Sequence, residues 1–203
     1  MTNTTFCAII VVRKVVILLA FLFLISGKAE SGKDTVANLL MKNSNVGTNC
    51  NYHIANSVKK IAKESFGWDG KKDEKGRALL QLIGDGGRQY NPDIWINKFK
   101  EGLDDMLSCY DKDNLMIVVP DVRYKNEVKQ LLDWGKQNDV NVLTIRVTRP
   151  NHENALTEEQ RANGSEVDLD DWGFWDVEII NDSTPQALEL TVLNTMEVLG
   201  IDY

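Results

Sequence analysis

The chain has 203 residues, the size of one domain or of one core with an inserted lid. Hydrophobic residues make up 43% and charged residues 26%, which excludes a disordered or collagen-like protein. The formal net charge of −7 argues against a protein that coats nucleic acid, so we expect no nucleic-acid partner. Cys7, Cys50 and Cys109 are widely spaced and form no CxxC pair, which favours a reducing compartment, the cytoplasm, over a disulfide framework or a zinc site.

An apolar run over residues 15–25 allows three interpretations. A membrane span over 7–25 would contain Arg13 and Lys14, each costing roughly 2.5–3.5 kcal/mol to insert. A secretory signal would need a cleavage site between small residues, and none follows the run. A central strand of a parallel sheet is buried on both faces and needs such a continuous run. We therefore predict a strand over 15–25, an N-terminal extension over 1–14, and no stable membrane association.

A glycine-rich motif, GKAESGKDT over 27–35, follows the run directly and precedes a helical pattern. Between a strand and a helix, this spacing is typical of a P-loop, although a glycine turn that merely caps a helix is the alternative. Lys33 can reach the β- and γ-phosphates of a nucleotide, and Asp34 replaces the usual magnesium-binding Ser or Thr. The predicted nucleotide-binding residues are Gly27, Ser31, Gly32, Lys33, Asp34 and Thr35.

Strands and helices alternate along the rest of the chain, which predicts an α/β fold with a parallel sheet. Strands are expected over 50–55, 115–119, 142–147 and 177–180. Helices are expected over 57–66, 76–83, 93–107, 127–134 and 185–199. Residues 84–87, which are rich in glycine, are expected to form a loop. The acidic segment over about 150–176 fits neither periodicity and is expected to be a lid inserted into one domain spanning 15–203.

Several polar residues outside the motif are candidates for the site. Asp121 follows a buried strand, where it could bind a magnesium water or the substrate, or simply cap the next helix. Arg77 and Gln81 are four residues apart and share a helical face, and Arg88 follows nearby. The arginines suit a phosphate and the glutamine suits a base edge, although all three could be ordinary surface residues. His53 and His152 have no metal-binding spacing, so the metal candidates are Asp34 and Asp121.

At this point the sequence resembles the phage and bacterial deoxynucleoside monophosphate kinases. Their P-loop also ends in Lys-Asp-Thr, and further matches follow in the family's order. These matches are Ile54-Ala55, Lys59, Leu80-Gln81, Gly87-Arg88, Pro92-Asp93-Ile94-Trp95, Asp121-Val122-Arg123, Asn126-Glu127, Arg146, Arg149-Pro150, Ser165-Glu166, Leu169-Asp170-Asp171, Asp176 and Asn181-Asp182. The chain departs from the family at Glu30, Asn163-Gly164 and Ser183.

The resemblance implies a three-layer P-loop NTPase fold with a helical acceptor-binding region, and transfer of a phosphoryl group from ATP, with Mg²⁺, to a deoxynucleoside monophosphate. It implies Lys33, Arg146 and Arg149 as catalytic residues. It implies, as substrate-binding residues, Lys59, Arg77, Gln81, Arg88, Trp95, Asp121 and Arg123. A phage-encoded protein would act in the host cytoplasm, and a homodimer remains open. The alternatives are a P-loop kinase of another small molecule, of the dephospho-coenzyme A or phosphomevalonate type, and a non-catalytic nucleotide-binding module.

Overall fold

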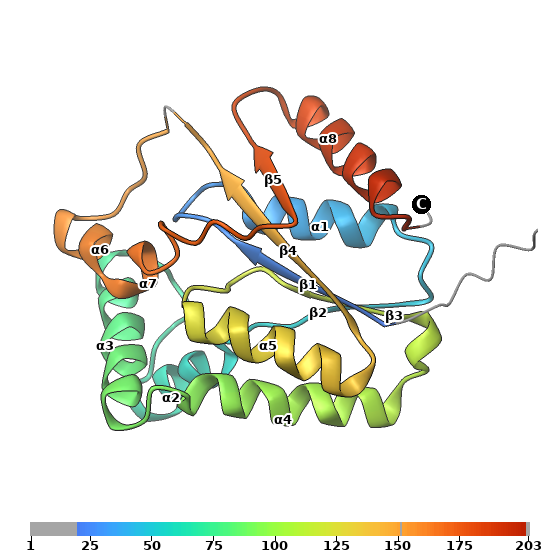
Figure 1. The fold of residues 1–203 in the computed structure, drawn as a ribbon. Coiled ribbons are helices and arrows are strands. Elements are labelled where there is room, and N and C mark those ends of the chain that lie inside the picture. The colour runs from blue at the N-terminus through green and yellow to red at the C-terminus, as the bar shows by residue number, and fades with distance from the viewer. Residues whose placement is uncertain (1–19, 151, 202–203) are drawn as a thin grey trace, which may run out of the picture.

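The computed structural model describes residues 20–150 and 152–201, which form a five-stranded parallel sheet with helices on both faces (Figure 1). The strand order is β2-β3-β1-β4-β5. The strands are β1 (Phe21–Ser26), β2 (Thr48–Asn51), β3 (Leu115–Val119), β4 (Asn141–Thr148) and β5 (Val177–Ile180). The helices are α1 (Lys33–Asn43), α2 (Asn56–Phe66), α3 (Glu74–Tyr90), α4 (Ile94–Cys109), α5 (Lys125–Asn138), α6 (Glu158–Ala162), α7 (Gly164–Val167) and α8 (Pro185–Val198), with a short 3-10 helix, η1 (Lys112–Asn114).

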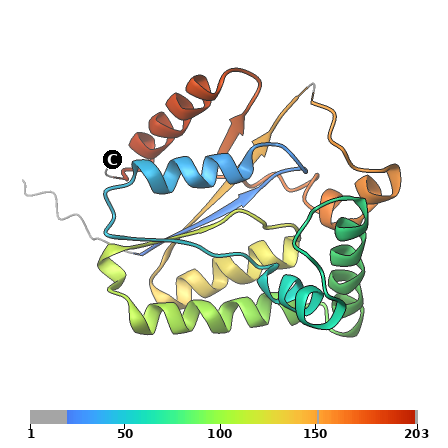
Figure 2. The same ribbon diagram turned by 180° about the vertical axis from the view of Figure 1, so that it is seen from behind.

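Helices cover the sheet in two layers, which confirms the predicted three-layer α/β architecture. Helices α1 and α8 pack on one face of the sheet, and α4 and α5 pack on the other (Figures 1 and 2). Each face has its own apolar cluster, because successive side chains of a strand point to opposite sides. The burial of both faces explains why the strands are continuous apolar runs rather than alternating ones.

Strand β1 shows this double burial most clearly. Leu22 and Leu24 belong to the cluster under α4 and α5, whereas Phe23 and Ile25 belong to the cluster under α1 and α8. The predicted strand over 15–25 is therefore observed from Phe21, while its first part, 15–19, and the extension 1–14 lie outside the described residues. Within 20–150 and 152–201, no helix is both long and apolar enough to cross a membrane.

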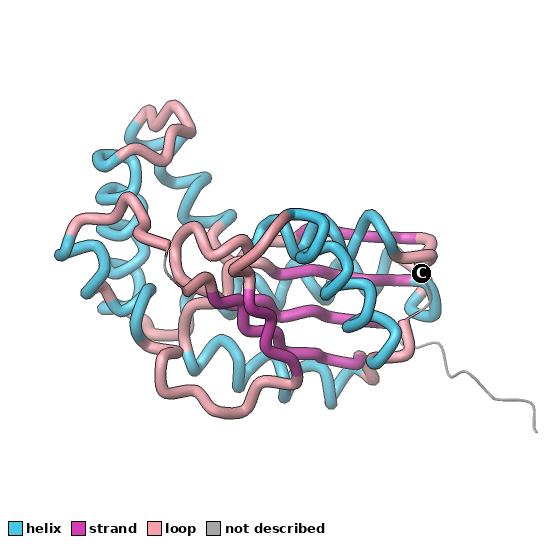
Figure 3. The backbone as a smooth tube through the Cα atoms, turned by 90° about the horizontal axis from the view of Figure 1, so that it is seen from above, coloured by secondary structure: helices cyan, strands magenta, loops and turns pink. Residues whose placement is uncertain are grey.

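The carboxyl ends of the parallel strands lie at one edge of the sheet, where the loops gather beside the short helices of the lid segment, defined here as residues 150–176 (Figure 3). This segment contributes α6 and α7, which lie beside α3 at the end of the molecule where the strand arrowheads point (Figure 1). Ligands of open α/β folds bind at this edge. The fold thus brings the glycine motif, the end of β3 and the lid segment together.

The expected loop over 84–87 is wrong, because these residues lie inside helix α3. The glycines allow close packing of the indole of Trp95 on the helix. A Cβ atom at Gly87 would lie 2.3 Å from Cζ2 of Trp95, and the carbonyl oxygen of Gly84 accepts a hydrogen bond from Trp95 Nε1 at 2.9 Å. Helix α3 consequently continues to Tyr90 and carries Arg88 in its last turn.

Candidate active site

The glycine motif forms a tight loop between β1 and α1. Gly32, the residue before α1, has a φ of 96°, a left-handed conformation that favours glycine. A Cβ atom there would lie 2.4 Å from Asn181 Nδ2, which instead donates a hydrogen bond to the carbonyl oxygen of Ser31 at 3.0 Å. The β5–α8 connection thereby holds the loop against the start of α1, whose free N–H groups attract anions.

Lys33 is the main cationic group of this loop. Its residue is 7% exposed, and its Nζ donates a weak hydrogen bond to the carbonyl oxygen of Lys28 at 3.3 Å. Burial, followed by the nearby Arg123 guanidinium, lowers the pKa of Lys33 from 10.5 to about 8. An anion beside Nζ would compensate for this desolvation, so the ammonium group is placed to bind phosphate.

The other predicted nucleotide-binding residues surround Lys33. Gly27 and Ser31 are buried, and the hydroxyl of Ser31 has no hydrogen-bond partner among the described residues. Asp34 and Thr35 are exposed to solvent in the first turn of α1, and their predicted role in binding a nucleotide stays a prediction. In the described part of the chain no group of three or more His, Cys, Asp and Glu residues could hold a metal by itself.

A cavity of about 370 Å³ opens next to Lys33 and contains the predicted acceptor side. The P-loop, helices α2 to α5 and the loops that precede α2 and α5 contribute to it, and Leu156, Ser165 and Glu166 of the lid segment line it as well. The lining includes every predicted substrate-binding residue: Lys59, Arg77, Gln81, Arg88, Trp95, Asp121 and Arg123. A volume in this range suits a small molecule. Residues that the sequence separates widely thus share one cavity.

The carboxylate of Asp121 fixes the connection between β2 and α2. Its two oxygens accept hydrogen bonds from the backbone N–H groups of Ile54 at 3.0 Å and Ala55 at 3.1 Å. Burial alone raises the pKa of Asp121, but His53, the Ala55 amide and Lys59 lower it, and the net pKa lies below its ordinary value. Asp121 is therefore charged, and it does not cap α5, which begins after Tyr124.

Arg123 connects the P-loop to the lid segment. Its Nη1 donates to the carbonyl oxygen of Gly27 at 3.4 Å, the carbonyl oxygen of Ser165 at 3.2 Å and Oε1 of Glu166 at 2.6 Å. The other carboxylate oxygen of Glu166 accepts from the backbone N–H of Ala29 at 3.0 Å. Arg123 thus lines the cavity and at the same time holds α7 against the loop.

Arg146 and Arg149 lie outside the lining of the cavity. Arg146 Nη1 donates to Ser26 Oγ at 3.1 Å, and its Nη2 pairs with Asp170 at 3.1 Å. Arg149 is exposed and donates to the carbonyl oxygen of Glu30 at 3.4 Å. Both arginines therefore lie next to the P-loop, on the side where β4 leaves the sheet, and their catalytic role stays a prediction.

Sequence reasoning assigned no role to Tyr124, Glu127 or Glu166, although all three contact predicted arginines. Tyr124 lies under Arg88, with 3.9 Å between the guanidinium carbon and the ring centroid. Glu127 pairs with Arg88 at 3.2 Å, and Glu166 pairs with Arg123. Glu127 and Glu166 were visible in the sequence as family matches, but their partners are distant in the chain.

Comparison with solved structures places this architecture among known folds. The APS kinase CysC of Mycobacterium tuberculosis, in complex with AMPPNP and APS, matches with a TM-score of 0.52 at 11% identity, over 88% of this chain and 98% of that chain. The tunicamycin resistance protein of Deinococcus radiodurans matches with a TM-score of 0.51 at 13% identity, over 90% of this chain and 96% of that chain. The chain therefore shares the α/β fold of these two proteins, with a parallel sheet between two layers of helices.

Sequence comparison is less informative. No family model matches the chain. The uncharacterized protein ORF76 of Ictalurid herpesvirus 1 is 35% identical over 125 residues, which cover 62% of this chain and 47% of that protein. The match thus spans about half the length of this relative.

Proposed function

We propose that the protein transfers the γ-phosphoryl group of ATP to the 5′-phosphate of a deoxynucleoside monophosphate. The observation that carries this proposal is the cavity beside Lys33, in which all the substrate-binding residues implied by the resemblance come together. Cationic groups of Lys59, Arg77 and Arg88 line it together with the apolar side chains of Trp95 and Leu80. Such a mixture suits a molecule that carries both a phosphate and a flat base.

The transfer needs positioning and charge neutralisation rather than a general base, because the acceptor phosphate is already an anion. An oxygen of the 5′-phosphate attacks the γ-phosphorus, the bond between that phosphorus and the β–γ bridging oxygen breaks, and ADP leaves. Lys33 and the loop amides stabilise the charge on the donor phosphates, while Arg88 orients the acceptor. The lid segment excludes water, which would otherwise accept the phosphoryl group.

Asp34 fits a role in holding Mg²⁺ better than Asp121 does. Magnesium in such sites is held by one or two carboxylates together with nucleotide phosphates and water, and exposed Asp34 stands in the first turn of α1. Both oxygens of Asp121 already accept backbone N–H groups. When bound, the ion would neutralise negative charge on the phosphates of ATP.

The proposal is tested by measuring ADP release from ATP with each deoxynucleoside and ribonucleoside monophosphate in turn. Dephospho-coenzyme A and phosphomevalonate complete the panel. We expect turnover with at least one deoxynucleotide, and its loss in Lys33→Ala, with Lys60→Ala, an exposed lysine of α2, as the matched control. Turnover with a different acceptor alone would replace the proposed substrate, and ATP binding without turnover on any acceptor would indicate a non-catalytic module.

A further inference from the structure

Glu127 is a buried carboxylate between two parts of the acceptor cavity. It is 2% exposed and lies in the first turn of α5. Its Oε2 accepts hydrogen bonds from the backbone N–H groups of Arg123 at 2.8 Å and Tyr124 at 3.1 Å. Its Oε1 accepts from Nη2 of Arg88 at 3.2 Å. One carboxylate therefore joins α3, which carries Arg88, to the β3–α5 loop, which carries Arg123.

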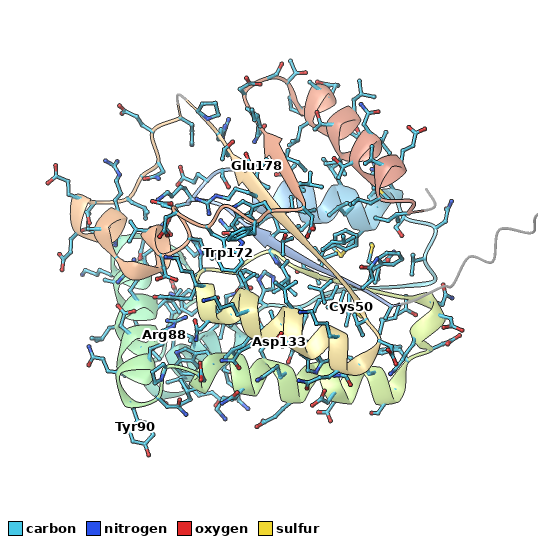
Figure 4. The ribbon with its side chains drawn as sticks, in the orientation of Figure 1. Cys50, Arg88, Tyr90, Asp133, Trp172 and Glu178 are labelled. Atoms are coloured by element: carbon cyan, nitrogen blue, oxygen red, sulfur yellow. The ribbon has the colours of Figure 1, made fainter. Side chains whose placement is uncertain are left out.

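The ring of Tyr124 supports the same guanidinium from another direction. The guanidinium carbon of Arg88 lies 3.9 Å from the ring centroid, within the range of a cation–π interaction. Arg88 projects from α3 toward the neighbouring α5 (Figure 4). Gly84, one turn earlier, leaves room for the side chain, because a Cβ atom there would lie 3.1 Å from Nη1 of Arg88.

This arrangement leaves several N–H groups of the guanidinium without a protein acceptor among the described residues. Among residues 20–150 and 152–201, Glu127 is the sole hydrogen-bond acceptor of the Arg88 side chain. The side chain is 23% exposed and lines the cavity. An arginine held at one N–H and on one face retains an edge that can bind a phosphate with two parallel hydrogen bonds.

A buried ion pair is a poor way to gain stability, because removing both charges from water costs about as much as their attraction returns. Burial raises the pKa of Glu127, against the opposing effects of Arg88 and of the two backbone amides. At the start of α5 only Oε2 of Glu127 serves backbone N–H groups, so the helix start does not by itself explain why Oε1 faces Arg88. The placement of Glu127 thus calls for a role beyond capping.

We propose that Glu127 is a positioning residue that, together with the ring of Tyr124, sets the Arg88 guanidinium to bind the acceptor phosphate. The inference rests on the proposed function, because it names the group that orients the acceptor in that reaction. The same carboxylate also accepts the backbone N–H of Arg123, so Glu127 fixes the position of Arg123 relative to Arg88.

The test is steady-state kinetics of Glu127→Gln, which keeps the shape of the side chain and one hydrogen-bonding oxygen but removes its charge. With the acceptor that the wild-type protein phosphorylates, we expect the acceptor KM to rise roughly tenfold or more. The ATP KM should stay within about threefold, because Lys33 and the loop are unchanged. Arg88→Lys should raise the acceptor KM similarly. The double variant should have an acceptor KM little higher than either single variant, because both substitutions disrupt the same interaction between Glu127 and Arg88.

The matched control is Glu101→Gln, the same chemical change at an exposed position of α4, which should leave both KM values unchanged. Tyr124→Leu provides a second variant if Glu127→Gln does not fold, and it should also raise the acceptor KM selectively. An active wild-type protein whose variants keep a normal acceptor KM, or lose only thermal stability, would overturn the positioning role. A wild-type protein inactive on every deoxynucleotide would instead overturn the proposed function.

Discussion

The indole Nε1 of Trp95 donates a hydrogen bond to the carbonyl oxygen of Gly84, 2.9 Å away, across the contact between α3 and the start of α4. That carbonyl stays in the middle of a continuous helix, and Gly87, almost one turn later, lies against the same indole ring. The glycines therefore let Trp95 approach the backbone of α3. Because Trp95 and Arg88 both line the cavity, this contact also fixes how α3 and α4 meet at the wall of that cavity.

The first prediction concerns these glycines. Gly87→Ala would place a Cβ atom 2.3 Å from Cζ2 of Trp95, so we expect a loss of about 1–3 kcal/mol in the free energy of unfolding from overpacking. Gly86→Ala is the matched control, because a Cβ atom at Gly86 meets nothing within 4 Å. It should gain roughly 0.5–1 kcal/mol, since alanine is the better helix former.

Urea unfolding of both variants measures these free energies. Opposite signs at neighbouring glycines would establish close packing as the reason for Gly87. If both variants were stabilised, the contact of Gly87 with Trp95 would not be as tight as the structure has it.

The same residues show where the sequence sufficed and where it did not. The order of strands and helices was predictable because burial on both faces leaves continuous apolar runs, as in β3, and the P-loop is a local motif between β1 and α1. The run Gly84-Asp85-Gly86-Gly87 misled, because glycine is common in loops and also permits close helix packing. Only the contact with Trp95 distinguishes a loop from a closely packed helix at these residues, and that contact depends on the tertiary fold.

The residues predicted to bind the acceptor could be named from the resemblance, but their contacts with one another could not be predicted. A family resemblance named Arg88 and Arg123, yet Glu127 pairs with Arg88 across 39 residues, and Glu166 pairs with Arg123 across 43. No periodicity records such pairs. Asp121 was expected at the edge of the sheet, and its two bonds to the backbone of Ile54 and Ala55 likewise needed the fold.

The second prediction is that nucleotide affinity falls as the pH rises through about 8. Burial holds the pKa of Lys33 near 8 in the free protein, so above this value the side chain loses its proton and its attraction for phosphate. Bound phosphate favours the charged form, which makes binding take up a proton and weakens affinity by up to about tenfold per pH unit. Calorimetry with a non-hydrolysable ATP analogue between roughly pH 7 and 9.5 measures this slope, which follows from the shifted pKa.

Two substitutions of Lys33 serve as controls. Lys33→Arg keeps its charge at these pH values, so its slope should vanish. Lys33→Ala should bind weakly at every pH and should lower turnover by roughly 10²-fold or more, because it removes a preorganised positive group. A slope in Lys33→Arg equal to that of the wild-type protein would assign the titration to another residue.

The third prediction concerns Glu30, which stands inside the P-loop with a φ of 63°. Its carboxylate pairs with Arg77 at 3.3 Å and lies 3.4 Å from His152 of the lid segment. Glu30→Gly removes a negative charge beside the phosphate site, so we expect ATP to bind about fivefold more tightly, the equivalent of about 1 kcal/mol of screened repulsion. It also relieves about 1–2 kcal/mol of left-handed strain, while the exposed ion pair contributes little.

Asp139→Gly is the matched control for the strain, because Asp139 has a φ of 54° at the end of α5, away from the loop. Both variants should therefore unfold at higher temperature, and Glu30→Gly alone should change ATP affinity. Equal ATP affinity in the two variants would show that the charge of Glu30 is already neutralised by Arg77.

The last prediction addresses how the lid segment is held. Oε2 of Glu166 accepts from the P-loop amide of Ala29 at 3.0 Å, and its Oε1 pairs with Arg123 at 2.6 Å, so one carboxylate joins α7 to two loops of the core. Glu166→Ala removes both bonds and leaves the Arg123 guanidinium with fewer partners. Because hydrogen bonds to charged groups contribute about 1.5–3 kcal/mol, amide hydrogen exchange over 152–176 should accelerate roughly tenfold or more.

Glu159→Ala, at an exposed position of α6, is the matched control and should exchange like the wild-type protein. A freer lid segment should also admit water, so the ratio of ATP hydrolysis to phosphoryl transfer should rise in Glu166→Ala. If amide exchange over 152–176 is equally fast in Glu166→Ala and Glu159→Ala, the lid segment is held mainly by its other contacts, such as the Lys28–Asp170 ion pair.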